Sequence, residues 1–152
     1  MTAEMTAGTF TAIFNRLSMK TQASGAAALT QIALAVERQT KLDLAQKTHQ
    51  YGTKTPAARG GPPALVSGTL RRSVTHTRPS THTFGWEVRV GLATGFYPPY
   101  PKKGRRTMSS KYGYYLERVH GFTFLEPAFR HVIAAGAAAT VGRMMAAEWD
   151  KP

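Results

Sequence analysis

The sequence predicts an α+β fold, and three observations lead to it. Apolar residues recur at helical spacing near the N-terminus and again after Pro127. Between these regions, residues 83–92 alternate apolar and polar side chains, as in a strand of an antiparallel sheet that is covered on one side. A chain of 152 residues is long enough to bury a core, so we expect one domain over residues 1–152.

The N-terminal region is predicted to form two helices with a break between them. In residues 10–17 the apolar positions fall at i, i+3, i+4 and i+7, which predicts a short amphipathic helix. We expect residues 18–25 to interrupt it, so that residues 1–25 form an N-terminal helical arm. A longer helix is expected over residues 26–48, with an apolar stripe that Thr40 interrupts.

The middle of the chain is predicted to hold short elements between loops. Residues 51–63 combine Gly-Gly and Pro-Pro, which leaves no room for regular structure. Ser67 is a candidate cap for a short helix over residues 68–74. An extended segment at 75–78 and the alternating strand at 83–92 then form a small antiparallel sheet.

A long basic connection precedes the C-terminal helix. The prolines of residues 93–113 exclude a central strand, and the cations of the basic loop at 98–111 exclude burial. A further strand is expected at 114–120, ending in a turn at Gly121. Pro127 suits the first turn of a helix, so we expect one long C-terminal helix packed on the sheet.

The formal net charge of +12 is concentrated in the middle of the chain. Residues 51–118 hold twelve cations and only Glu87 and Glu117, whereas residues 1–50 and 119–152 are close to balance. Such an excess predicts a nearby polyanion or acidic protein surface. A solubilising surface without a partner is the alternative. The candidate contact residues are Lys102, Lys103, Arg105, Arg106, Lys111, Arg71 and Arg72.

Composition excludes several classes of protein. The chain has no cysteine, so it has neither disulfides nor thiolate chemistry. No apolar run approaches the length of a membrane span, and the N-terminus lacks the basic and apolar regions of a signal peptide. We therefore expect synthesis and assembly in a cytoplasm, without a membrane partner.

Catalytic patterns are missing from the sequence. The five histidines form no metal-ligand pair at helical or strand spacing, and the eight carboxylates form no acid/base pair or two-metal cluster. Ser67 and Ser73 lie in no nucleophile elbow, and Gly60-Gly61 is not followed by a phosphate-binding Lys-Ser or Lys-Thr. We expect no enzyme activity, no cofactor and no metal.

Two segments, in order, resemble the neck and tail-completion proteins of long-tailed bacteriophages. Residues 62–74, PPALVSGTLRRSV, are similar to the family's Thr/Ser-Gly-x-Leu-Arg-x-Ser-Ile/Val segment. Residues 114–117, then Gly121 and residues 124–129, resemble its Tyr-Ala-x-x-x-Glu-x-Gly and Pro-Phe-Leu-x-Pro-Ala segments. The strand end at 88–91 lies between them, where the family has its own Val-Gly strand end.

The resemblance covers roughly residues 26–149 and implies a structural virion protein at the head–tail junction. Such subunits form rings, usually of six copies, that join adjacent connector or head-closure proteins to tail proteins around the DNA channel, with passing contact to double-stranded DNA. The resemblance implies that the loop at 98–111 is an insertion. It also implies structural roles for the motif residues Pro63, Gly68, Leu70, Tyr114, Glu117 and Pro127.

Two alternatives stay open at this point. A tail terminator or a head-closure ring protein is also a small α+β ring protein, and it differs in the layer of the head–tail junction that it occupies. A free nucleic-acid-binding protein of no sequence preference also fits the central charge. Against it, the tyrosines near the cations match no known stacking motif and the sequence contains no recognition helix.

Overall fold

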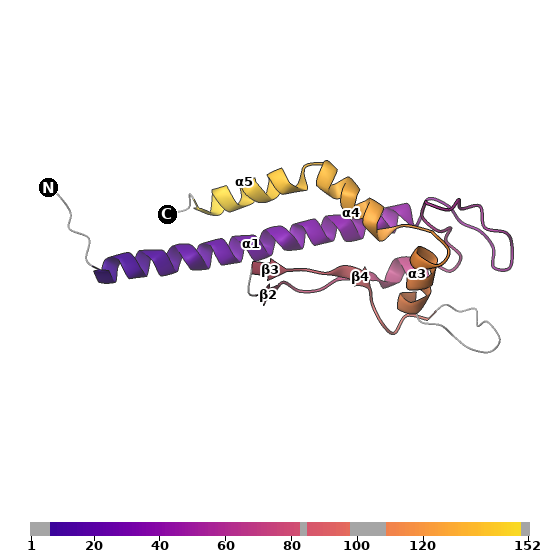
Figure 1. Cartoon of the computed structure of the whole chain (residues 1–152), viewed down its shortest axis with the longest axis horizontal. Coiled ribbons are helices and arrows are strands. Elements are labelled where there is room, and N and C mark those ends of the chain that lie inside the picture. The colour runs from indigo at the N-terminus through magenta and orange to yellow at the C-terminus, as the bar shows by residue number, and fades with distance from the viewer. Residues whose placement is uncertain (1–6, 83–84, 98–108, 150–152) are drawn as a thin grey trace.

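The computed structural model describes residues 7–82, 85–97 and 109–149 of the chain. It has the predicted α+β composition, in an elongated arrangement of three layers with the long helix α1 in the middle (Figure 1). The β-strands lie along one side of α1, and α4 and α5 lie along the other. The helices are α1 (Ala7–Asp43), α2 (Thr69–Ser73), α3 (Ser109–Arg118), α4 (Leu125–Ala134) and α5 (Ala137–Trp149). The strands are β1 (Val74–His76), β2 (Ser80–His82), β3 (Gly85–Glu87) and β4 (Val90–Leu92).

Helix α1 runs without a break, so the predicted interruption at residues 18–25 is wrong. That segment contains no proline, and one glycine inside a helix costs only about 1 kcal/mol. Trp86 packs there: its Cδ1 atom lies 3.7 Å from the position a Cβ would take on Gly25. The polar residue that interrupts the apolar stripe, Thr40, is buried, and its hydroxyl donates to the Val36 carbonyl at 2.8 Å.

The predicted strand at 83–92 is divided into β3 and β4, which pair with β2 and β1 in one interrupted hairpin. Val74 faces Leu92 in one half, whereas Ser80 faces Glu87 in the other, so the register shifts by one residue between them. The shift is a β-bulge in which Arg78 and Pro79 together oppose Val88. Proline has no N–H to donate to the ladder, so a bulge is where it is tolerated.

The core of the protein lies at the C-terminal end of α1. Leu44, Val74, Leu116 and Phe124 are buried against one another there. Leu70, Leu92, Phe122 and Leu125 pack around this cluster. These residues come from the segment after α1, from α2, the hairpin, α3 and the start of α4, so these elements meet at this end. Further buried apolar residues lie along α1 and α4: Ala28, Ala33, Val36, Ala128 and Val132.

Two predictions about the second half of the chain are wrong. Residues 109–118 form helix α3, where a connecting loop was expected up to residue 113 and a strand from residue 114. The C-terminal region is helical as predicted, but Gly136, with φ of 92°, divides it into α4 and α5. These helices pack on α1 and not on the sheet, because α1 separates them from the hairpin (Figure 1). The predicted turn at Gly121, with φ of 70°, and the predicted first-turn position of Pro127 are confirmed.

In the part of the chain that the structure describes, no helix is both long and apolar enough to span a membrane.

Candidate interaction surface

Helices α2 and α3 are held together by a contact in which glycine is required. Leu70 of α2 and Leu92 of β4 both point at Gly113 of α3. A Cβ on Gly113 would overlap Leu92 Cδ1 and would lie 3.4 Å from Leu70 Cδ1. The two leucines therefore occupy the space of the missing side chain. The contact joins Leu70, in the first resembling segment, to the residues that directly follow the second segment and precede the third. This role of Gly113 was not predicted.

Glu117 fixes the corner between α3 and α4. Its Oε1 atom accepts hydrogen bonds from the backbone N–H groups of Leu125 at 3.0 Å and Phe124 at 3.2 Å. These are among the first N–H groups of α4, which have no partner within the helix. A carboxylate at this position also interacts favourably with the positive end of the helix dipole. The structure thus gives Glu117 the role of an N-terminal cap supplied by another helix.

The predicted loop at 51–63 is confirmed as irregular, but its end is tied to the α3–α4 corner. The Gly60 N–H donates to the Gly121 carbonyl at 2.7 Å. Thr123 donates twice, from its N–H to the Gly61 carbonyl at 3.2 Å and from its hydroxyl to the Gly60 carbonyl at 2.8 Å. On the N-terminal side, Leu65 exchanges hydrogen bonds with the Lys47–His49 segment. The loop is therefore held at both ends by backbone contacts.

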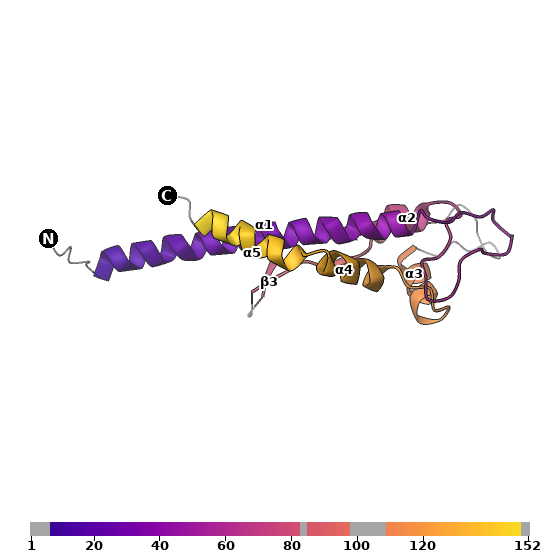
Figure 2. The same ribbon diagram turned by 90° about the horizontal axis from the view of Figure 1, so that it is seen from above.

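We call residues 44–73 and 109–124 the basic end, and α1, the hairpin, α4 and α5 the shaft. The basic end lies where α1 ends, far from both chain termini (Figures 1 and 2). Its described cations are all exposed: Lys47, Lys54, Arg59, Arg71, Arg72, Lys111 and Arg118. Its one carboxylate is Glu117, which is engaged at the start of α4. None of the seven cations forms an ion pair with any described residue.

Three cations of the shaft form ion pairs, in contrast. Lys41 pairs with Glu37, Arg89 with Glu87, and Arg130 with Glu126. Glu37 also accepts from His76 Nδ1 at 2.6 Å, which links α1 to β1. Burial alone would raise the pKa of Glu37, but the hydrogen bonds from Lys41 and His76 outweigh it and hold that pKa below its ordinary value. The stabilisation from this lowered pKa is present near neutral pH and is lost in acid.

Aromatic side chains are exposed among the cations of the basic end. Tyr51, Tyr112, Tyr114 and Tyr115 are each more than two-fifths exposed, and Tyr114 and Tyr115 meet edge to face with ring centroids 6.2 Å apart. Tyrosine and arginine are enriched in the centres of protein interfaces, where their large side chains are buried by a partner. The combination of exposed tyrosines and unpaired cations makes this end the candidate interaction surface.

The residues predicted from sequence have different places in the structure. Arg71, Arg72 and Lys111 are exposed at the basic end, on α2 and α3. Lys102, Lys103, Arg105 and Arg106 lie outside the described residues. Of the motif residues, Pro63 is buried, Gly68 precedes α2 with φ of 73°, and Leu70 packs on the core, whereas Tyr114 and Pro127 are exposed.

The described residues contain no cluster of three or more histidines or carboxylates that could hold a metal ion. Of the histidines, His76 has a described ion-pair partner in Glu37. Comparison with family models, with curated proteins and with solved structures found no match for this chain. The function must therefore be argued from the surfaces described above.

Proposed function

We propose that this chain is a structural virion protein that forms an oligomeric ring at the head–tail junction of a long-tailed bacteriophage, as a neck or tail-completion protein. A tail terminator or head-closure ring protein remains the alternative within the same assembly. In either role the ring joins head to tail around the DNA channel, and the protein acts through the surfaces that contact its neighbours.

The observation that carries the proposal is the contact at Gly113, where Leu70 of the first segment meets Leu92, directly after the second, and Gly113, directly before the third. Each of these segments alone resembles the family only weakly. In sequence the segments are separated by up to forty residues. In the structure Leu70, Leu92 and Gly113 are in contact, and Glu117 reaches from the same helix to the start of α4. A chance resemblance of unrelated segments has no reason to gather them in one core.

The unpaired cations of the basic end also favour a second candidate, a free nucleic-acid-binding protein. Such a protein would bind duplex DNA as a monomer or dimer, with an affinity that falls steeply with salt. The exposed tyrosines and Val119 argue for the ring, because the phosphate backbone of a duplex offers them no apolar surface.

The test is deletion of the gene from the phage that encodes it. We expect lysates with DNA-filled heads and separate tails, and we expect purified protein added to such a lysate to restore joined, infectious particles. Intact infectious virions from the deletion phage would refute the proposal. A duplex-DNA shift by the monomer, with no effect on virions, would establish the second candidate instead.

A further inference from the structure

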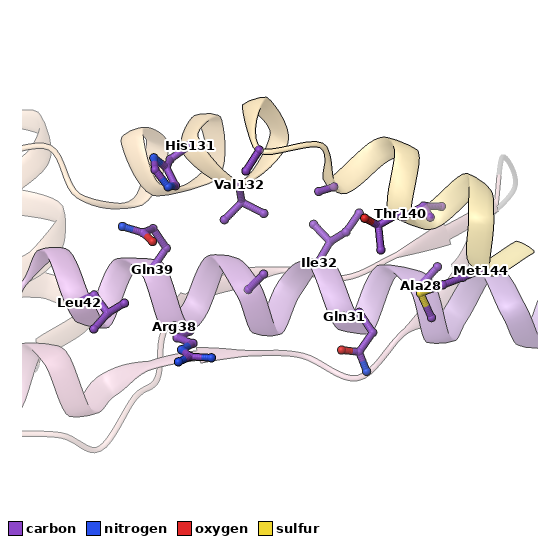
Figure 3. A pocket seen from close by; sticks show the side chains of 14 residues that line it. Ala28, Gln31, Ile32, Arg38, Gln39, Leu42, His131, Val132, Thr140 and Met144 are labelled. Atoms are coloured by element: carbon purple, nitrogen blue, oxygen red, sulfur yellow. The ribbon is translucent and has the colours of Figure 1, made fainter.

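A long apolar groove runs along the shaft between α1 and the pair α4–α5. Its volume is about 570 Å³, and Figure 3 shows Ile32 and Ala28 of α1 facing Val132, Thr140 and Met144 across it. Small residues form much of its floor and walls, including Ala35 of α1 and Ala137 of α5. The two sides of the shaft are therefore in contact without filling the space between them.

Large apolar side chains remain exposed beside this groove. Leu42, which lines it, is 52% exposed, and Ile133 of α4 is 39% exposed. Apolar residues form most of the lining, together with Gln31, Arg38 and His131.

The chain carries a segment of the shape that such a groove accepts. The N-terminal part of α1 continues beyond the ends of α5 and the hairpin, so none of the described helices and strands lies beside it (Figures 1 and 2). Over this part the sequence repeats apolar residues at Phe10, Ile13, Phe14 and Leu17, the spacing of one helical face. Helical segments of this length without packing partners are marginal in water.

This segment cannot fill the groove of its own chain. It belongs to the same continuous helix, α1, that forms one wall of the groove. Folding it back would require breaking α1, at the expense of the hydrogen bonds of the broken turn. A second copy meets no such restriction, and an amphipathic helix lying in an apolar groove is a common mode of recognition.

We propose that residues 7–21 of one copy pack into the groove between α1 and α4–α5 of the next copy. Each copy then places its residues 7–21 in the groove of one neighbour, and its own groove binds residues 7–21 of the other neighbour. Such a heterologous contact generates a closed ring when the rotation between copies closes. The inference rests on the proposed ring function for its biological setting, but the contact itself is a property of the purified chain.

The absence of cysteine from the sequence allows a direct test by disulfide trapping. Two full-length variants with one cysteine each are mixed and mildly oxidised: Ile13→Cys in the donated helix and Thr140→Cys on the groove wall. We expect a disulfide-linked dimer from this mixture. The matched control pairs Ile13→Cys with Leu34→Cys, which is exposed on α1 but does not line the groove, and it should give little product.

Sedimentation velocity on charge variants measures the strength of the contact. Phe14→Glu in the donated helix and Ala35→Arg in the groove should each weaken assembly about a hundredfold or more, because each would bury an unpaired charge. Leu34→Glu, the control at an exposed position outside the groove, should assemble like the unmodified chain. Circular dichroism of each variant checks that α1 is retained.

Two results would overturn the inference. If Phe14→Glu and Ala35→Arg assemble as well as the unmodified chain, the ring is held by another surface, and the proposed function stands without this contact. If the unmodified chain is a monomer at all concentrations and no disulfide forms, the contact does not exist. Whether the protein belongs to the virion is then decided separately by the deletion phage.

Discussion

The basic end and the shaft of this protein differ in the kind of side chain that each leaves exposed: charged side chains at the basic end, and apolar side chains along the shaft. The basic end contains the packed cluster around Phe124 and Leu116, but its exposed cations form no ion pair with any described residue. The shaft has three ion pairs between Lys or Arg and Glu, but it leaves an apolar groove open between α1 and α4–α5. The difference suggests two kinds of contact: an electrostatic one with an unlike partner at the basic end, and an apolar one between like subunits along the shaft.

The largest effect is expected from reversing charge at the basic end. Arg71/Arg72→Glu, and outside the described residues Lys102/Lys103→Glu and Arg105/Arg106→Glu, should prevent heads from joining tails. Each charge-assisted hydrogen bond to an acidic partner is worth about 1.5–3 kcal/mol, and a reversed charge repels that partner. The measurement is electron microscopy of lysates from phages that carry each variant.

The matched control for charge reversal is Arg78/Arg143→Glu, which changes the net charge equally at exposed positions of the shaft. We expect it to leave joining intact. Normal particles with altered DNA ejection from the basic-end variants would point to contact with DNA in the channel. If every basic-end pair can be reversed without effect, this surface is merely solvated.

The next effect compares two phenylalanines, one in each region. Phe124→Ala should lower the free energy of unfolding by about 3–5 kcal/mol, because Phe124 is 1% exposed in the core. Phe129→Ala should change it by less than about 1 kcal/mol in the monomer, because Phe129 of α4 is half exposed. Urea unfolding of both variants tests the difference. Equal losses would contradict the assignment of the core to the basic end.

Two helical glycines should respond to alanine with opposite signs. Gly113→Ala inserts a methyl group against Leu92 and should destabilise the protein by about 1–3 kcal/mol. Gly142 of α5 has open space around it, so Gly142→Ala should stabilise by about 0.5–1 kcal/mol through helix propensity. Thermal unfolding of the two variants provides the measurement. A neutral Gly113→Ala would mean that Leu70 and Leu92 yield easily, and the tight joint between α2 and α3 would be refuted.

The smallest effect compares two glutamates near the start of α4. Glu117→Ala leaves two N–H groups at the start of α4 without their acceptor and should cost about 1–2 kcal/mol. Glu126→Ala removes only an exposed ion pair with Arg130 and should cost about 0.5 kcal/mol or less. Amide hydrogen exchange adds a local measurement, in which Glu117→Ala should speed exchange at Leu125 and Glu126→Ala should not. The reverse order of costs would remove the capping role of Glu117.

The α+β class and most turns followed from local patterns in the sequence, and the errors have identifiable physical causes. Helix α3 was predicted as a strand because its buried positions are Gly113 and Leu116. Their spacing of three is helical, but a glycine does not count as apolar, so the pattern was hidden. The predicted break in α1 gave too much weight to Gly25, which tertiary contact with Trp86 accommodates.

The features that position the candidate surface depended on contacts distant in sequence. The cap on α4 comes from Glu117, seven residues before Phe124 and on another helix, where no local capping pattern applies. The division of residues 83–92 depends on Pro79 in the partner strand. The excess of cations was visible in the sequence, but their lack of carboxylate partners became evident only when the fold placed Glu117 at α4.

The most direct test of the central claim is to locate the chain in purified virions. A C-terminal tag on the protein is labelled with gold particles, and the labelled virions are imaged by electron microscopy. The account predicts label at the head–tail junction of joined particles, in several copies arranged around the axis. Purified virions that carry no label, with the protein left behind in the soluble lysate, would contradict it.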